Sequence, residues 1–138
     1  MRSARRLAVL IVFGALIVVP APAKEGIRAK LDHPVRLHAA AGTIVRVAWH
    51  LVDENGRPFA ASGIYLRVSR CGRGPLRLAA TNRGHGHYSV RVRTPKGGIR
   101  KLLVGLKGWR ITSTHRARAD AFFQFDPPLH HDCPQDRS

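Results

Sequence analysis

Histidines are the residues of this chain that could most directly bind a metal ion, and the chain has eight of them. His85 and His87 are two positions apart, so on a strand both imidazoles would project from the same face. Imidazole is a good ligand for copper and zinc. Further histidines occur in the run His130-His131-Asp132 and at His33 and His38 near the start of the chain.

The surroundings of His85 and His87 also fit a second interpretation. Gly84 and Gly86 indicate a turn, where histidines are usually solvated, and the sequence fixes no third ligand near them. Binding of copper or zinc through these two residues is therefore the alternative function, and no cofactor is expected.

Residues 1–23 have the pattern of a secretory signal peptide. Three arginines precede the apolar run 7–19, and the segment Pro20-Ala21-Pro22-Ala23 offers small residues at the positions that a signal peptidase reads. The run is shorter than the roughly 20 residues that span a bilayer. We predict cleavage after Ala23 and a secreted or cell-envelope location, with the general secretory and twin-arginine routes both open. Removal of the three arginines lowers the formal charge from +16 to +13.

Cys71 and Cys133 are the two cysteines of the chain. Because an exported domain meets an oxidising compartment, a single pair predicts a disulfide. The alternative is a pair of thiols that bind a metal, but the close Cys-x-x-Cys spacing of structural zinc sites is absent.

Catalytic motifs are not evident in the sequence. There is no Gly-x-Ser-x-Gly, and no glycine-rich loop precedes a predicted helix. The neighbouring carboxylates Asp53 and Glu54 lie in a predicted turn, and both cysteines are assigned to the disulfide. We therefore expect a protein that is not an enzyme.

The elements that must position these residues are strands, because apolar residues alternate with polar ones along most of the chain. In residues 43–52, Val47, Trp49 and Leu51 share one face and Arg46 and His50 the other. Trp49 is the expected central aromatic residue of the core. Turns are expected at 53–58 and 81–86, and a long basic loop at 107–118. The seven expected strands are 35–39, 43–52, 64–69, 76–80, 87–93, 99–106 and 119–125.

About seven short alternating strands predict an all-β fold, an Ig-like β-sandwich following the signal peptide, with a small closed barrel as the alternative. The domain is expected to cover residues 24–128. Residues 129–138 are expected to form a C-terminal tail that only Cys133 holds to the body.

Arginine side chains on the outward faces of these strands are the main indication of function. Guanidinium groups bind phosphate, sulfate and carboxylate in forked pairs. The alternative explanations are a biased amino-acid composition and an ordinary solvated face. The residues expected to bind an acidic polymer are Arg67, Arg91 and Arg93, with Lys107, Trp109 and Arg110 from the basic loop. No nucleic-acid-binding motif accompanies the charge, so specific nucleic-acid recognition is not expected.

Two turn patterns resemble those of known exported domains. Asp53-x-x-Gly56-x-Pro58 precedes a strand, and Gly86-x-Tyr88 opens a later one. Across residues 43–127 the chain resembles bacterial secreted Ig-like domains of the YtkA-like and carboxypeptidase-regulatory-like groups. The resemblance implies an accessory or binding module and transfers no active site. The expected function is thus an exported non-catalytic module that binds an acidic cell-envelope polymer or an envelope protein, with no transmembrane segment after cleavage.

Overall fold

A computed structural model describes residues 26–134, which form ten strands and no helix. The all-β expectation is confirmed, although the strands number ten rather than seven. The predicted signal peptide, residues 1–23, lies outside the described residues. The strands are β1 (Arg28–Leu31), β2 (Ile44–Val52), β3 (Ile64–Arg70), β4 (Arg73–Ala79), β5 (Thr81–Gly84), β6 (His87–Arg93), β7 (Ile99–Leu106), β8 (Trp109–Ile111), β9 (Arg116–Arg118) and β10 (Ala121–Gln124).

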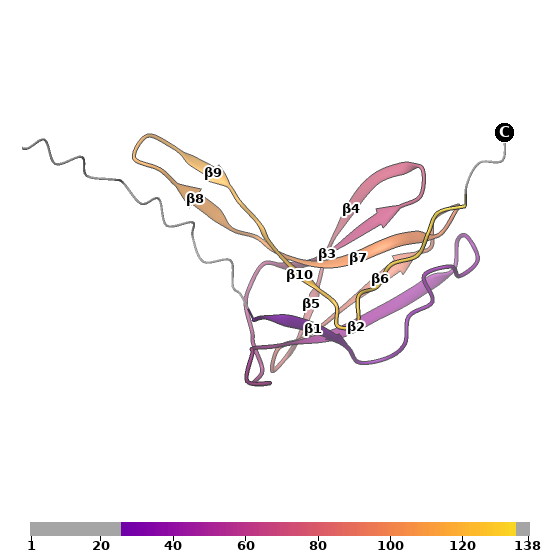
Figure 1. The fold of residues 1–138 in the computed structure, drawn as a ribbon, viewed down its shortest axis with the longest axis horizontal. Coiled ribbons are helices and arrows are strands. Elements are labelled where there is room, and N and C mark those ends of the chain that lie inside the picture. Colours follow the sequence, from indigo (N-terminus) through magenta and orange to yellow (C-terminus); the bar gives the residue numbers. More distant parts are fainter. Residues whose placement is uncertain (1–25, 135–138) are drawn as a thin grey trace, which may run out of the picture.

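The strands pair antiparallel in three sheets (Figure 1). The first sheet has the order β1-β2-β6-β5, and the second has the order β10-β7-β3-β4. The third is the two-stranded ribbon β8-β9, which projects away from the two larger sheets. Within residues 26–134 no helix has the length and apolar character that crossing a membrane requires.

The hydrophobic core takes side chains from both four-stranded sheets. Trp49 of β2 is fully buried, as predicted, and its ring stacks on Tyr88 and meets Phe125 edge-on, with centroid distances of 6.1 Å in both cases. Leu66 and Val104 of the second sheet are also fully buried. Each fully buried aliphatic side chain contributes about 1.5–3 kcal/mol, so the alternating residues of β2, β3, β6 and β7 dominate the stability of the fold.

The chain near the start of the domain differs from expectation. Residues 35–39, expected as a strand, form a loop that buries Leu37, whose carbonyl accepts a hydrogen bond from the Ile99 N–H. The first strand is instead β1, where Ala29 is buried and its neighbours Arg28 and Lys30 are exposed. A four-residue strand whose one fully buried side chain is a methyl group has almost no hydrophobic periodicity to detect.

Two further segments expected as turn or loop are strands. β5 is exposed throughout and pairs with β6 across an irregularity between Asn82 and Gly84. β8 and β9 are also exposed throughout and pair only with each other. Because these strands have no buried face, backbone pairing defines them, and no alternation of apolar residues marks them in the sequence.

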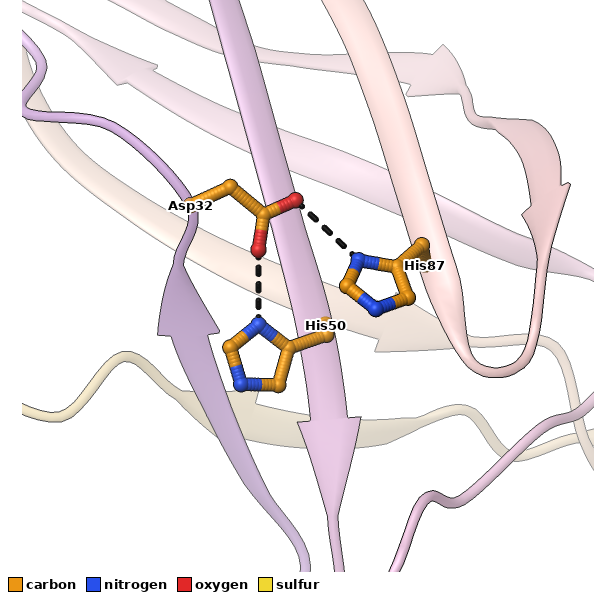
Figure 2. A group of neighbouring side chains, drawn as sticks. All are labelled: Asp32, His50 and His87. Atoms are coloured by element: carbon orange, nitrogen blue, oxygen red, sulfur yellow. Dashed lines mark hydrogen bonds and ion pairs between the residues drawn. The ribbon is translucent and has the colours of Figure 1, made fainter.

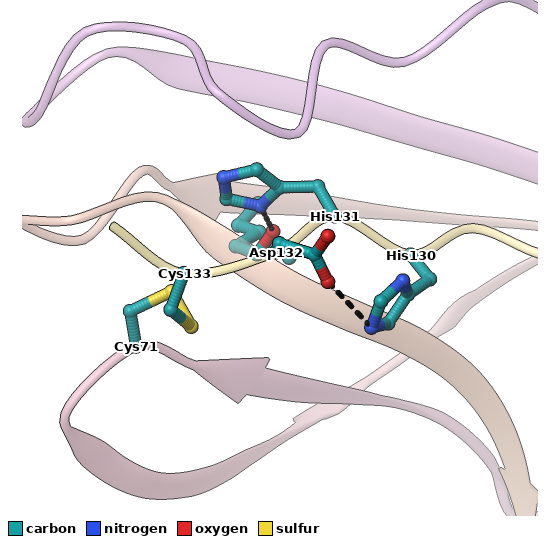
Figure 3. Close-up of a disulfide and its surroundings, with 6 residues drawn as sticks. Cys71, His130, His131, Asp132 and Cys133 are labelled. Atoms are coloured by element: carbon teal, nitrogen blue, oxygen red, sulfur yellow. Dashed lines mark hydrogen bonds and ion pairs between the residues drawn. A yellow bond between two sulfur atoms is a disulfide. The ribbon is translucent and has the colours of Figure 1, made fainter. Parts of the chain in front are cut away.

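The disulfide between Cys71 and Cys133 is present, as predicted, with a Cα–Cα distance of 5.5 Å (Figure 3). Cys71 lies in the turn between β3 and β4, whereas Cys133 lies in the tail. The expectation that only Cys133 holds this tail is wrong. The Leu102 N–H donates to the Leu129 carbonyl at 3.2 Å, and the His131 N–H donates to the Arg100 carbonyl at 2.8 Å. The tail therefore continues the pairing along β7 beyond the end of β10.

Candidate functional site

The side of the first sheet that faces away from the core carries the polar residues of β2 and β6. On these strands Val47, Trp49, Tyr88 and Val90 point into the core, so their neighbours in the chain point outward. We call this side the outer face of the first sheet. Its directly opposed residue pairs, from one end to the other, are His50–His87, Ala48–Ser89, Arg46–Arg91 and Ile44–Arg93.

An open groove of about 580 Å³ runs from this face to the edge of β4. Its size falls in the range of ordinary ligand sites, about 300–1,000 Å³. No carboxylate lines it. We call it the arginine groove. It is lined by four arginines, Arg46, Arg77, Arg83 and Arg91, together with Leu78, Ala79, Thr81, Ser89 and Val90.

The path of the chain explains why arginines from four strands meet in this groove. β4 belongs to the second sheet and β5 to the first, and the single residue Ala80 separates them. The chain therefore passes from one sheet to the other at this corner, which brings Arg77 and Arg83 to the same hollow. Arg46 of β2 and Arg91 of β6 reach it from the outer face, where they are directly opposed.

The groove has little internal charge compensation. Arg77 lies 3.4 Å from a carboxylate oxygen of Asp120, and half of the Arg77 side chain remains exposed. Arg46, Arg83 and Arg91 have no acidic partner among residues 26–134. Like charges placed directly opposite on a sheet destabilise it, so the Arg46–Arg91 pair raises the free energy of the fold. A bound anion would remove that cost.

Asp120 is a nearly buried carboxylate that joins β3, β4 and the base of the β8–β9 ribbon. The Arg118 guanidinium donates to both of its oxygens, at 3.0 and 3.1 Å, and the Gly108 N–H and the Tyr65 hydroxyl also donate to it. The hydrogen bonds from Arg118 outweigh the opposing effect of burial and hold the pKa of Asp120 well below its usual range. Because Arg118 and Tyr65 already bind this carboxylate, Arg77 is only a peripheral partner.

Asp32, His50 and His87 form a second polar group, which we call the histidine–aspartate cluster (Figure 2). One carboxylate accepts from both rings, with His50 Nδ1 at 2.7 Å from Oδ1 and His87 Nδ1 at 3.2 Å from Oδ2. The ring centroids are 5.1 Å apart. Burial opposes ionisation of Asp32, but the hydrogen bonds from His50 and His87 outweigh it, so the pKa of Asp32 lies below its ordinary value.

The backbone fixes the geometry of this cluster. His50 and His87 are opposed on β2 and β6, and Asp32 follows β1 with its N–H bonded to the Ala48 carbonyl at 2.9 Å. The turn before His87 contains Gly86, which has a φ of +77°. A Cβ at Gly86 would lie 2.6 Å from the Phe59 carbonyl oxygen, so glycine is required for this close approach.

The two histidines predicted as metal ligands lie in different surroundings. His87 belongs to the histidine–aspartate cluster, whereas His85 is exposed in the turn with a φ of +52° and is not part of the cluster. The partners of His87 in the cluster are Asp32, which directly follows β1, and His50, which belongs to β2. The outward position of His50 follows from the alternation in β2, but nothing in the sequence places Asp32 beside it.

The six residues predicted to bind an acidic polymer do not share one surface. Arg91 lies in the arginine groove, and Arg93 lies farther along the outer face, where it donates to the Gly42 carbonyl at 3.2 Å. Arg67 lies on the second sheet, directly opposite Arg77, with its guanidinium 5.3 Å from the Phe122 ring centre.

The remaining predicted residues lie at or near the β8–β9 ribbon. Lys107 precedes β8, and Trp109 and Arg110 are part of it. Trp109 is 57% exposed, and the Arg116 guanidinium stacks 4.2 Å from its ring centre. The structure thus groups Arg91 with Arg46, Arg77 and Arg83 rather than with these residues.

Comparison with known proteins gives no match to this chain among family models, curated proteins or solved structures.

Proposed function

We propose that this protein is an exported, non-catalytic binding module with an Ig-like β-sandwich architecture, and that it binds an acidic envelope polymer in the arginine groove. The observation that carries the proposal is the groove itself. Four arginines line one hollow, and among the residues that the structure describes only Arg77 of these four has a carboxylate partner.

The shape of the site favours a chain-like anion over a small one. The groove is open to solvent along the corner between two sheets, and its walls combine arginines with small side chains such as Thr81 and Ser89. Guanidinium groups form forked hydrogen bonds with phosphate, sulfate and carboxylate alike. An open row of them suits repeated anionic groups of a polymer.

The proposed export rests on two features. The disulfide between Cys71 and Cys133 is typical of proteins in oxidising compartments. The sequence of residues 1–23 has the pattern of a cleaved signal peptide. In such a compartment acidic polysaccharides and phosphate-bearing wall polymers are the abundant polyanions.

The test compares binding of the protein from residue 24 onward to immobilised heparin, a teichoic-acid-like polymer and duplex DNA. The groove variant carries Arg46→Ser and Arg91→Ser. The control carries Arg57→Ser and Arg100→Ser, which remove the same charge from exposed positions outside the groove. On DNA, loss of two phosphate contacts should lower the slope of log affinity against log salt by about 2.

We expect the groove variant to bind all three polymers more weakly than the control does. Equal losses in the two variants would mean that binding follows net charge alone and would overturn the groove as the site. Strong binding to DNA without binding to the other two polymers would replace the proposed polymer with nucleic acid.

A further inference from the structure

We propose that Asp32, His50 and His87 form a binding site for a divalent cation of borderline softness, Zn²⁺ or Cu²⁺. The cluster offers one carboxylate oxygen and two imidazole nitrogens, all within 4.8 Å of one another. It lies on the same outer face, four residues along β2 and β6 from Arg46 and Arg91, and is independent of the proposed polymer binding. Figure 2 shows both rings turning Nδ1 toward the carboxylate.

The distances suit a cation placed between these three groups. Zinc binds imidazole nitrogen at about 2.0–2.1 Å and carboxylate oxygen at about 2.0–2.2 Å. Asp32 already lies 2.7 Å from His50 Nδ1 and 3.2 Å from His87 Nδ1. Tetrahedral bonds of this length place neighbouring ligand atoms about 3.3 Å apart, which is close to both separations, so one ion could be shared by the three residues.

Cation binding would require the imidazoles to give up protons and the cation to give up water molecules. An imidazole that donates from Nδ1 gives up that proton, either to solvent or by exchange to its own Nε2, and the freed Nδ1 lone pair bonds to the cation. The cation gives up water molecules in exchange for the three protein ligands. The His87 side chain is 47% exposed and that of His50 30%. The remaining coordination positions therefore face solvent and keep water.

The ligand set favours zinc and copper over harder ions. Two of the three ligand atoms are imidazole nitrogens, whereas Mg²⁺ and Ca²⁺ prefer all-oxygen sites. Lys30 is directly opposite His50 on β1, and its charge opposes cation binding. Its long stem lets the ammonium turn into water, so the nearer Asp32 carboxylate dominates the local field.

No other histidine among residues 26–134 has comparable surroundings. His130 is near Asp132 at 3.9 Å but has no second imidazole in that pair, and His38 lies near the His131 ring with no carboxylate between them. The His130–Asp132 pair therefore provides a matched control, since it is also exposed and also joins an imidazole to a carboxylate.

The experiment measures cation binding by isothermal titration calorimetry on the protein from residue 24 onward, with Zn²⁺, Cu²⁺ and Mg²⁺ titrated separately. We expect one Zn²⁺ or Cu²⁺ per chain and no binding of Mg²⁺. His50→Ala and His87→Ala should each weaken binding by about tenfold or more, and Asp32→Asn should also weaken it. His130→Ala should leave the affinity unchanged.

A second measurement separates site loss from misfolding. The cation should raise the thermal midpoint of the wild-type protein and of His130→Ala by the same amount, and that of His50→Ala by clearly less. Circular dichroism of the apo variants checks that they are folded, which their outward positions favour. Absence of binding to wild type, or wild-type affinity in both His50→Ala and His87→Ala, would overturn the site. Neither result would bear on binding of polymers in the arginine groove.

Discussion

Arg46 and Arg91 lie directly opposite each other on β2 and β6, both exposed and neither paired with a carboxylate among the described residues. A sheet gains stability from cross-strand pairs of opposite charge and loses it from pairs of like charge. The arrangement is therefore unfavourable for folding alone. An anion that bridged the two guanidinium groups would offset this repulsion.

Substitution of Arg46 should separate stability from binding. Arg46→Thr is expected to raise the free energy of unfolding by about 0.5 kcal/mol, because it removes the like-charge contact and introduces a good strand former. The same variant should bind heparin more weakly. Chemical denaturation and heparin affinity measure the two effects. Arg93→Thr is the control: it introduces the same strand former opposite Ile44, so it should lack the part of the gain that comes from removing a like-charge contact.

The carboxylate of Asp120 should make the free energy of unfolding depend on pH below about 4. Its pKa is lowered in the folded state, so its stabilisation is complete above the ordinary value near pH 4 and is lost as the pH falls toward the lowered pKa. Asp120→Asn should reduce the free energy of unfolding at pH 7 by about 2 kcal/mol and flatten its dependence on pH below 4. Urea unfolding at several pH values measures both.

Asp126 provides the comparison for this prediction. It forms an ion pair with Arg28 at 3.3 Å, and both side chains are about half exposed or more. Such surface pairs contribute little, so Asp126→Asn should change the free energy of unfolding by less than about 1 kcal/mol. Equal effects of the two substitutions would contradict the role given to Asp120.

Trp49 should be essential for folding. Its side chain is fully buried between Tyr88 and Phe125, so Trp49→Ala should cost about 3–5 kcal/mol, a large share of the stability of a small domain. Trp109→Ala, in the exposed ribbon, should cost less than about 1 kcal/mol. Denaturant unfolding followed by far-ultraviolet circular dichroism compares the two. A Trp49→Ala protein as stable as wild type would show that the assigned strand register is wrong.

The disulfide should contribute strongly to stability. It joins residues 62 positions apart, and the chain-entropy model assigns a loop of that length about 4 kcal/mol. The double variant Cys71→Ser and Cys133→Ser should lose about that amount in urea unfolding. Thiol titration of the denatured, unreduced protein should find no reactive thiol, and two after reduction. Two thiols before reduction would rule out the bridge.

The exported protein should begin at Lys24. The charged start, the short apolar run and the Ala-Pro-Ala sequence before Lys24 together predict cleavage after Ala23. Intact-mass measurement on protein recovered outside the cytoplasm decides this prediction. A mass that includes residues 1–23 would contradict it.

Long strands with one buried face could be predicted from the sequence. In β2 and β6 the apolar residues alternate over seven or more positions, which places Trp49 and Tyr88 in the core and Arg46 and Arg91 outside it. The disulfide could also be predicted, because the chain has only two cysteines. In contrast, β1, β5 and the β8–β9 ribbon bury little or nothing, so their residues carry no periodic pattern.

The candidate sites were harder to predict because they depend on which strands are neighbours. Asp32 is 18 residues from His50 and 55 from His87, and only the order β1-β2-β6 brings the three together. Arg77 joins the arginine groove because the chain changes sheets at Ala80. Alternation along a strand shows which face a residue is on, but it does not show which residue lies opposite.

The tail beside β7 also covers part of a sheet edge that β10 leaves open. β10 pairs with residues 103–106 of β7, and the segment around Leu129 and His131 pairs with residues 100–102. Together they leave no long stretch of this apolar strand with free backbone groups on that side, and such exposed edges are templates for aggregation. Without the disulfide the tail would be held only by its backbone hydrogen bonds to β7 and by the packing of Leu129 against the core, so it should detach more readily. The reduced protein is therefore expected to form edge-to-edge oligomers more readily than the oxidised protein does.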